Sequence, residues 1–201
     1  NLAAVILQMI NLGLGDVEEF GFIDPPDTRS VRDGIALLDE LGALAPERAG
    51  RPRRLTRTGR RLVRLPIDPR LGRMVIEADR RGCVREVLVI AAALSLQDVR
   101  ERPEDQRAEA DALHRRFDVP GSDLLSLVRL WDHVEDRRRA LSWNRLRREC
   151  RDEHLNFLRI REWRDLHRQL AQAARKVGVV PGEEEAGADD VHRAVLAGLL
   201  S

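Results

Sequence analysis

Arginine residues recur along one side of the segment from Asn156 to Val177. At about 100° per residue they share one face of an amphipathic helix whose other face is apolar. Guanidinium groups on a rigid helix can bind phosphate oxygens without reading bases. The row therefore indicates contact with a nucleic-acid backbone, although a plain solvated surface has the same pattern. The row consists of Arg161, Arg164, Arg168 and Arg175, and the apolar face of Trp163, Leu166, Leu170, Ala173, Ala174 and Val177.

Other polar residues near this helix are further candidates. Asn156 and Arg159 project nearer the apolar side, so they either brace neighbouring helices or reach a nucleic acid from another angle. The tryptophans lie in helical patterns and core packing is their default role. A tryptophan can stack bases only if it is exposed beside arginine, and Trp143 has the strongest claim. The polar residues around it, which could reach a nucleic-acid backbone, are Ser142, Asn144 and Arg145.

Enzymatic chemistry has no visible basis in this segment. Lys176 is the only lysine and Val177 follows it, so there is no phosphate-binding loop with a Gly-Lys-Ser or Gly-Lys-Thr ending. The five histidines lack metal-ligand spacing, and neither a serine elbow nor a cysteine beside a base is present. We therefore predict no catalytic residue and no metal site.

Composition predicts a folded protein of one large or two small domains. The 201 residues are 43% hydrophobic with a net charge of +1, so any basic site must be local. Cys83 and Cys150 lie too far apart for a metal knuckle, which favours reduced thiols in a cytoplasmic protein. No membrane span or signal peptide is visible. Both ends look cut, and we expect a fragment of a longer chain.

The N-terminal part is typical of a winged helix. A helix is expected from about Leu2 to Ile10, and Asp24-Pro25-Pro26 blocks its continuation. Asp27 or Thr28 caps the next helix, which ends near Gly42. Between Ala43 and Leu55 two short strands and a loop fit, with Leu44 and Leu55 as inward anchors. A third helix from Thr56 to Pro66 completes a domain of residues 1–66.

Beyond Pro66 the pattern is helical throughout. Asp68-Pro69 opens a helix that Gly82 closes, and Val84 to Leu96 is apolar on nearly every side, as in a helix buried within a bundle. Residues 67–177 are predicted to form this bundle. Residues 178–201 read as a linker with the first helix of a further region. The predicted fold class is mainly α, a winged helix with a small β-ribbon followed by an all-helical bundle.

The order of several motifs resembles that of one known family. The segments are NLAAVILQ at 1–8, FGFIDPP at 20–26, LLDELGAL at 37–44, Leu55-Thr56 with Gly59, LPIDPRL at 65–71, Cys83 before AAALS at 91–95, and Asn156-Phe157-Leu158 with Arg161. Over residues 1–176 they resemble the winged-helix and ratchet domains of DEAH-box RNA helicases. Within that family, LSWN at 141–144, RIREW at 159–163 and residues 191–201 resemble the bacterial HrpA type.

The resemblance implies a function for the parent protein. That enzyme would couple ATP hydrolysis to 3′-to-5′ movement on RNA, with this segment in the wall of its channel for single-stranded RNA. ATP and Mg²⁺ would bind RecA-like domains that precede Asn1, so this segment has no cofactor and alone no ATPase activity. Its partners would be those domains and an OB-like region, with the ribosome or RNA-processing proteins as further candidates and no membrane.

Two alternatives remain open. A free-standing winged-helix regulator would need a basic second helix, but Val31 to Leu41 contains only Arg32 as a cation. The domain resembles the family's structural hinge more than a DNA reader. The second alternative is a protein-docking scaffold, which exposed apolar residues on the first helix would favour.

Overall fold

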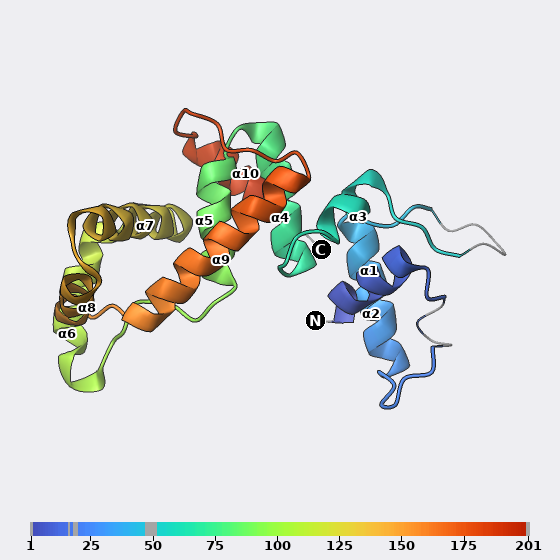
Figure 1. The fold of residues 1–201 in the computed structure, drawn as a ribbon, viewed down its shortest axis with the longest axis horizontal. Coiled ribbons are helices and arrows are strands. Elements are labelled where there is room, and N and C mark those ends of the chain that lie inside the picture. The colour runs from blue at the N-terminus through green and yellow to red at the C-terminus, as the bar shows by residue number, and fades with distance from the viewer. Residues whose placement is uncertain (1, 16, 18–19, 47–51, 200–201) are drawn as a thin grey trace.

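The computed structural model describes residues 2–15, 17, 20–46 and 52–199, and this part of the chain is mainly α-helical. Figure 1 shows an elongated arrangement, with α1 to α3 at one end, α4, α5 and α10 in the middle and α6 to α8 at the other end. None of the helices in the described ranges is both long and apolar enough to cross a bilayer.

Three helices form the N-terminal unit: α1 (Leu2–Leu12), α2 (Thr28–Glu40) and α3 (Arg57–Leu62). Asp27 caps α2 by accepting a hydrogen bond from the Ser30 amide at 2.9 Å. Thr56 caps α3 in the same way, accepting from the Gly59 amide at 3.1 Å. Polar side chains that compete for backbone amides thus fix where both helices begin.

The predicted β-ribbon is not seen. One isolated antiparallel bridge joins Leu44 to Leu55, and no strand occurs in the part of the chain that the structure describes. Amides of Ala45 and Thr56 donate the hydrogen bonds on either side of the bridge, at 2.8 and 2.9 Å. Pro46 follows directly, and proline is disfavoured within a strand. The predicted tip, residues 47–51, lies outside the described residues.

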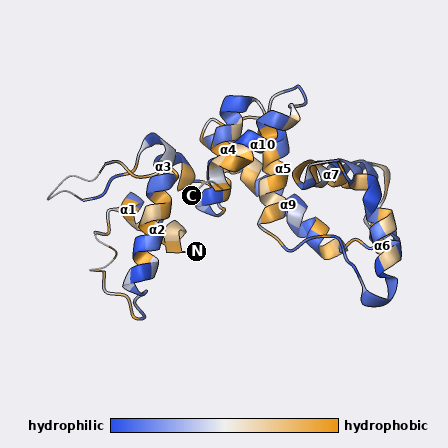
Figure 2. Cartoon of the chain, turned by 180° about the vertical axis from the view of Figure 1, so that it is seen from behind, coloured by the Kyte–Doolittle hydropathy of each residue, from blue (hydrophilic) through white to orange (hydrophobic). Residues whose placement is uncertain are grey.

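The middle of the molecule is built on a helix pair, α4 (Pro69–Arg81) and α5 (Val84–Leu94). As predicted, Asp68 caps α4, Pro69 is its first residue, and Gly82 ends it with φ of +69°. The predicted burial of α5 is also confirmed, since its residues from Val87 to Ala92 are all buried. Figure 2 shows its ribbon largely in the colour of hydrophobic residues.

Helix α10 (Ala188–Leu199) packs against this pair, chiefly on α4. Val191, Ala194 and Val195 are buried in the contact. Gly198 makes the closest approach, because a Cβ atom at this position would collide with the Arg70 carbonyl oxygen and lie 2.7 Å from Met74 Cγ. The helix therefore folds back onto the bundle, and the close contact depends on a residue without a side chain.

The other end consists of α6 (Arg107–His114), α7 (Asp123–Ala140) and α8 (Trp143–Asp152), with 3₁₀ turns at Glu104–Gln106 and Arg115–Phe117. Helix α9 (Phe157–Lys176) runs from α8 to the middle of the molecule (Figure 1). Trp163 anchors it, since the buried indole donates a hydrogen bond to the Val89 carbonyl of α5 at 3.1 Å. The ring also packs edge-on against Trp131 of α7, with centroids 4.9 Å apart.

One arginine ties the N-terminal unit to the helical bundle. Arg61 of α3 donates from Nε to the Val177 carbonyl at the end of α9, at 3.1 Å. Its terminal nitrogen also pairs with Asp79 of α4 at 3.1 Å. A cation at the C-terminal end of a helix is favourably placed in the field of the helix dipole. Arg61 thus contacts both α4 and α9 from outside the bundle.

Candidate nucleic-acid interface

The arginine row of α9 is not electrostatically uniform. Arg161 is exposed and makes no ion pair with a carboxylate of the described chain. Arg164 forms a bidentate ion pair with Glu135 of α7, and Arg168 pairs with Asp165 on its own helix at 2.6 Å. Arg175 is exposed near the far end of α9. All four residues lie on α9, as expected, but only some of them carry uncompensated charge.

Trp143 lies where α8 begins, and three guanidinium groups surround it. Its side chain is 40% exposed. The guanidinium carbon of Arg138 lies 4.1 Å from the ring centroid, that of Arg164 5.4 Å and that of Arg161 5.8 Å. All three distances are within the range of cation–π attraction. The condition set from the sequence for a stacking platform, an exposed tryptophan beside arginine, is therefore met.

The three polar neighbours of Trp143 are all exposed. Ser142 precedes the first turn of α8, but its side chain makes no capping hydrogen bond. Asn144 and Arg145 follow Trp143 in that turn, and neither forms an ion pair or side-chain hydrogen bond with the described residues. Ser142, Asn144 and Arg145 thus present free polar groups to solvent next to the indole ring.

Asn156 and Arg159 brace the fold. Asn156 caps α9 by accepting from the Arg159 amide at 3.0 Å, and its own amide donates to Glu101 at 2.7 Å. Arg159 donates to the Asp98 carbonyl at 2.9 Å. An antiparallel bridge between Arg100 and Leu155 lies alongside. Of the two roles considered for these residues, bracing is the one that their contacts support.

A polar cavity of about 610 Å³ lies between α5, α7 and α9. Its charged groups come from all three helices. Burial lowers the pKa of His167 below its ordinary value, while Glu135 opposes that shift. Burial also raises the pKa of Asp132, although Arg85 lies against it at 2.5 Å. The cavity is lined by Arg85, Trp131, Asp132, Glu135, Asp136, Arg139, Arg164, His167 and Arg168.

Sequence reasoning missed the arginines that α5 and α7 contribute. Arg85 and Arg139 line the polar cavity, and Arg138 lies closest to Trp143. One signal was available, because Arg137, Arg138 and Arg139 are consecutive and precede Trp143 by only a few residues. Successive residues of a helix point about 100° apart, so a run of three spans about 200° of its surface, and Arg138 is the one that faces Trp143.

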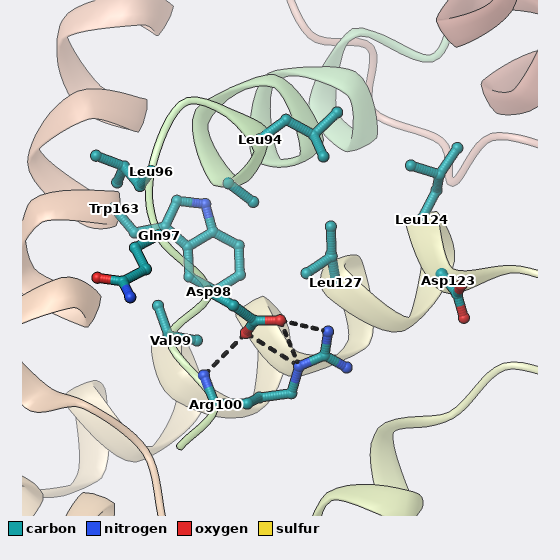
Figure 3. Close-up of a pocket in the computed structure, with 11 residues that line it drawn as sticks. Leu94, Leu96, Gln97, Asp98, Val99, Arg100, Asp123, Leu124, Leu127 and Trp163 are labelled. Carbon is teal, nitrogen blue, oxygen red and sulfur yellow. Dashed lines mark hydrogen bonds and ion pairs between the residues drawn. The ribbon is translucent and has the colours of Figure 1, made fainter. Parts of the chain in front are cut away.

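A smaller, more apolar cavity of about 290 Å³ lies beside Trp163 (Figure 3). Leucine side chains form much of its wall, and Asp98 and Arg100 pair at its edge with an N–O distance of 2.7 Å. Burial pushes the pKa of Asp98 up, but hydrogen bonds from Arg100 outweigh that and hold it below the ordinary value. The charges of Asp98 and Arg100 thus compensate each other at the edge of this cavity.

One group of possible metal ligands occurs among the described residues: His133, Glu149 and Glu153. Both carboxylates already have cationic partners. Arg137 forms a bidentate pair with Glu149, and Arg116 pairs with Glu153 at 2.6 Å while His133 Nε2 lies 3.0 Å from it. Burial raises the pKa of Glu153, but those hydrogen bonds bring it below its ordinary value. The group is an ion-pair network that joins α7 and α8.

Known proteins resemble this chain over its whole length. Residues 68–159 match the family model described as helicase associated domain (HA2), ratchet-like. The chain is 49% identical over 201 residues to ATP-dependent RNA helicase HrpA of Escherichia coli (strain K12), and covers 16% of that protein. It is 45% identical to the HrpA homolog of Haemophilus influenzae, again covering 16%. It is 29% identical to the probable ATP-dependent RNA helicase DHX35 of Homo sapiens, covering 27%. The chain spans about a sixth of the length of these bacterial relatives.

Proposed function

Because this chain is the helicase-associated, ratchet-like region of an HrpA-like DEAH-box RNA helicase, we propose that it lines the helicase's RNA channel and supports 3′-to-5′ translocation. It would hold the strand through its phosphates. A motor must bind every register of its track about equally well, and phosphate contacts carry no sequence information. Arginines on a braced helix suit this task.

One observation carries the proposal, the uncompensated charge of Arg161. Its guanidinium is exposed and lies on the same surface as Arg164 and Arg138, around Trp143. Asn156 and Arg159 hold the start of α9 against the 98–101 segment, so the charge is presented from a fixed support. Ser142, Asn144 and Arg145 extend the polar surface and are the further proposed contacts, with Arg168 at its edge.

The remaining parts of the chain take supporting roles in this proposal. Residues 1–66 would be a winged helix whose wing begins at the bridge between Leu44 and Leu55, residues 67–177 the ratchet domain, and residues 178–201 the connection to an OB-like region. ATP and Mg²⁺ would bind RecA-like domains of the same helicase, so nucleotide hydrolysis would not take place in this segment. The similarity to helicases extends over all 201 residues of this chain, and this supports the proposed role over that of a free-standing regulator.

A second role has its own support. Val5 and Leu12 of α1 are exposed, as are Leu14, Phe20 and Ile23 in the segment that follows. Grouped apolar side chains on a surface are typical of interaction sites. These residues favour the N-terminal unit as a docking face for other domains of the same helicase.

RNA binding tests the main proposal. We would measure the affinity of the chain for a mixed-sequence single-stranded RNA of about 12 nucleotides by fluorescence anisotropy, at several salt concentrations. Each phosphate contact contributes about 0.7 to the slope of log K against log salt for single strands. Arg161→Ala should lower both affinity and slope. Arg164→Ala should change the slope less, because Glu135 already compensates that charge.

A matched control is Arg80→Ala, which removes an exposed arginine from α4 that pairs with Glu77. It should leave affinity and slope as in the unmodified chain. The double variant Arg161→Ala with Arg164→Ala is the decisive test of whether α9 contacts RNA. Unchanged affinity and slope in that variant would refute the assignment of α9 to the RNA surface.

A further inference from the structure

Trp143 is the exception among the three tryptophans. Trp131 and Trp163 are 8% and 1% exposed, whereas Trp143 is 40% exposed. Its indole N–H makes no hydrogen bond with the described residues, unlike that of Trp163, which donates to Val89. Phe157 packs edge-on against the ring with centroids 5.9 Å apart and holds it from one side. The fold therefore supports this indole but leaves part of its surface open to solvent.

The arginines around the ring carry more charge than the nearby carboxylates compensate. Of Arg138, Arg161 and Arg164, only Arg164 has a carboxylate partner, Glu135. Arg138 donates a hydrogen bond from Nη1 to the Leu141 carbonyl at 3.4 Å. The Nε atom of Arg138 is buried and has no hydrogen-bond partner among the described residues. Two unpaired guanidinium groups within 6 Å of one ring repel each other, and an anion between them would remove that cost.

We propose that Trp143, Arg138 and Arg161 form a nucleotide-binding site for single-stranded RNA: one base stacks on the open part of the indole, and the adjacent phosphates bind the two guanidinium groups. This proposal rests on the proposed function and deepens it. Arg138 lies nearest the ring, so the base uses the indole surface that Arg138 leaves uncovered.

Stacking agrees with what a translocating protein requires. Every base has an aromatic face, so a stacking contact is tolerant of sequence, unlike hydrogen bonds to base edges. The contact would hold one nucleotide at a fixed point along the strand, while arginines bind the flanking backbone on both sides. The stacked base would thus define single-nucleotide registers on a surface that otherwise binds only the phosphates.

The test compares two RNAs that share the same backbone. One is a single-stranded oligonucleotide of about 12 nucleotides, and the other is an abasic oligonucleotide of equal length. Trp143 is the exposed fluorophore of the 201-residue chain, so the base-bearing RNA should quench tryptophan emission and the abasic RNA should quench it much less. Trp143→Leu should weaken binding of the base-bearing RNA by at least about fivefold and leave abasic RNA binding nearly unchanged.

Trp143→Phe retains an aromatic face and should keep most of the affinity while losing the quenching signal. Trp131→Phe is the control, because it removes a buried fluorophore and should leave the quenching intact. Thermal unfolding of each variant shows whether it folds, and the comparison of the two RNAs on the unmodified chain needs no variant. Equal quenching and equal affinity for both RNAs would overturn the stacking site alone. No binding of either RNA would overturn the proposed function as well.

Discussion

Replacing Gly198 by alanine should destabilise the protein, against the usual rule for helices. In an open helix this change raises stability by about 1 kcal/mol, because alanine is the better helix former. Here the new Cβ would lie 2.7 Å from Met74 Cγ and closer still to the Arg70 carbonyl oxygen. Carbon atoms pack best at about 3.5–4.0 Å, so α10 must move away from α4 by about 1 Å.

The cost follows from what α10 buries. Val191 and Val195 are almost fully buried, and complete burial of a valine contributes about 1.5–3 kcal/mol. A gap of 0.5–1 Å forfeits roughly a quarter to a half of the dispersion contact. After the gain of about 1 kcal/mol in helix propensity, we expect the free energy of unfolding to fall by up to about 2 kcal/mol.

Urea denaturation followed by circular dichroism measures this change. Arg193→Ala is the matched control, since Arg193 is an exposed residue of the same helix and its replacement should have little effect. Gly198→Ala with unchanged or increased stability would mean that α10 does not rest on α4, and the packing described above would be wrong.

Two further predictions follow from titratable groups. Burial and nearby carboxylates raise the pKa of Cys83 to about 11 and of Cys150 to about 12. Because the reactive thiolate is then scarce at pH 8, a disulfide-exchange reagent should label neither thiol until the protein unfolds. Rapid labelling of the folded chain would contradict this. The pKa of His167 is lowered from 6.5, chiefly by burial. Below about pH 6.5 the unfolded chain therefore binds a proton that the folded chain does not. The free energy of unfolding consequently decreases as the pH is lowered through this range. Urea titrations at pH 7.5, 6.5 and 5.5 should show a smaller fall for His167→Phe, and an identical fall would disprove the contribution.

Local signals predicted the helices well. The Asp68-Pro69 start and Gly82 stop of α4 each have a single-residue cause, and both are confirmed. The all-round burial of α5 follows from its unbroken apolar sequence. The β-ribbon was predicted wrongly because the length of a ladder depends on its partner strand. Among the described residues only one bridge forms, and Pro46 and Pro52, on either side of residues 47–51, disfavour a strand.

The candidate site was harder to predict than the fold. Helical periodicity placed Arg161 and Arg164 on one face, but it could not show that Glu135, 29 residues away, neutralises Arg164. Similarly, the exposure of Trp143 depends on how the turn after α7 aims α8, which no local pattern determines. Charge compensation is a property of tertiary neighbours, so it appears only once α7 and α9 are packed together.

Helix α9 is held at its start, its middle and its end. Asn156 donates to Glu101 at the start, Trp163 donates to Val89 in the middle, and Arg61 donates to the Val177 carbonyl at the end. Arg61 and Arg161 therefore act at points about 24 Å apart along one axis, since 16 residues separate Val177 from Arg161 at 1.5 Å per residue. Because the helix is fixed at three places, it behaves as a strut: it keeps a constant spacing between the N-terminal unit and the basic end of α9.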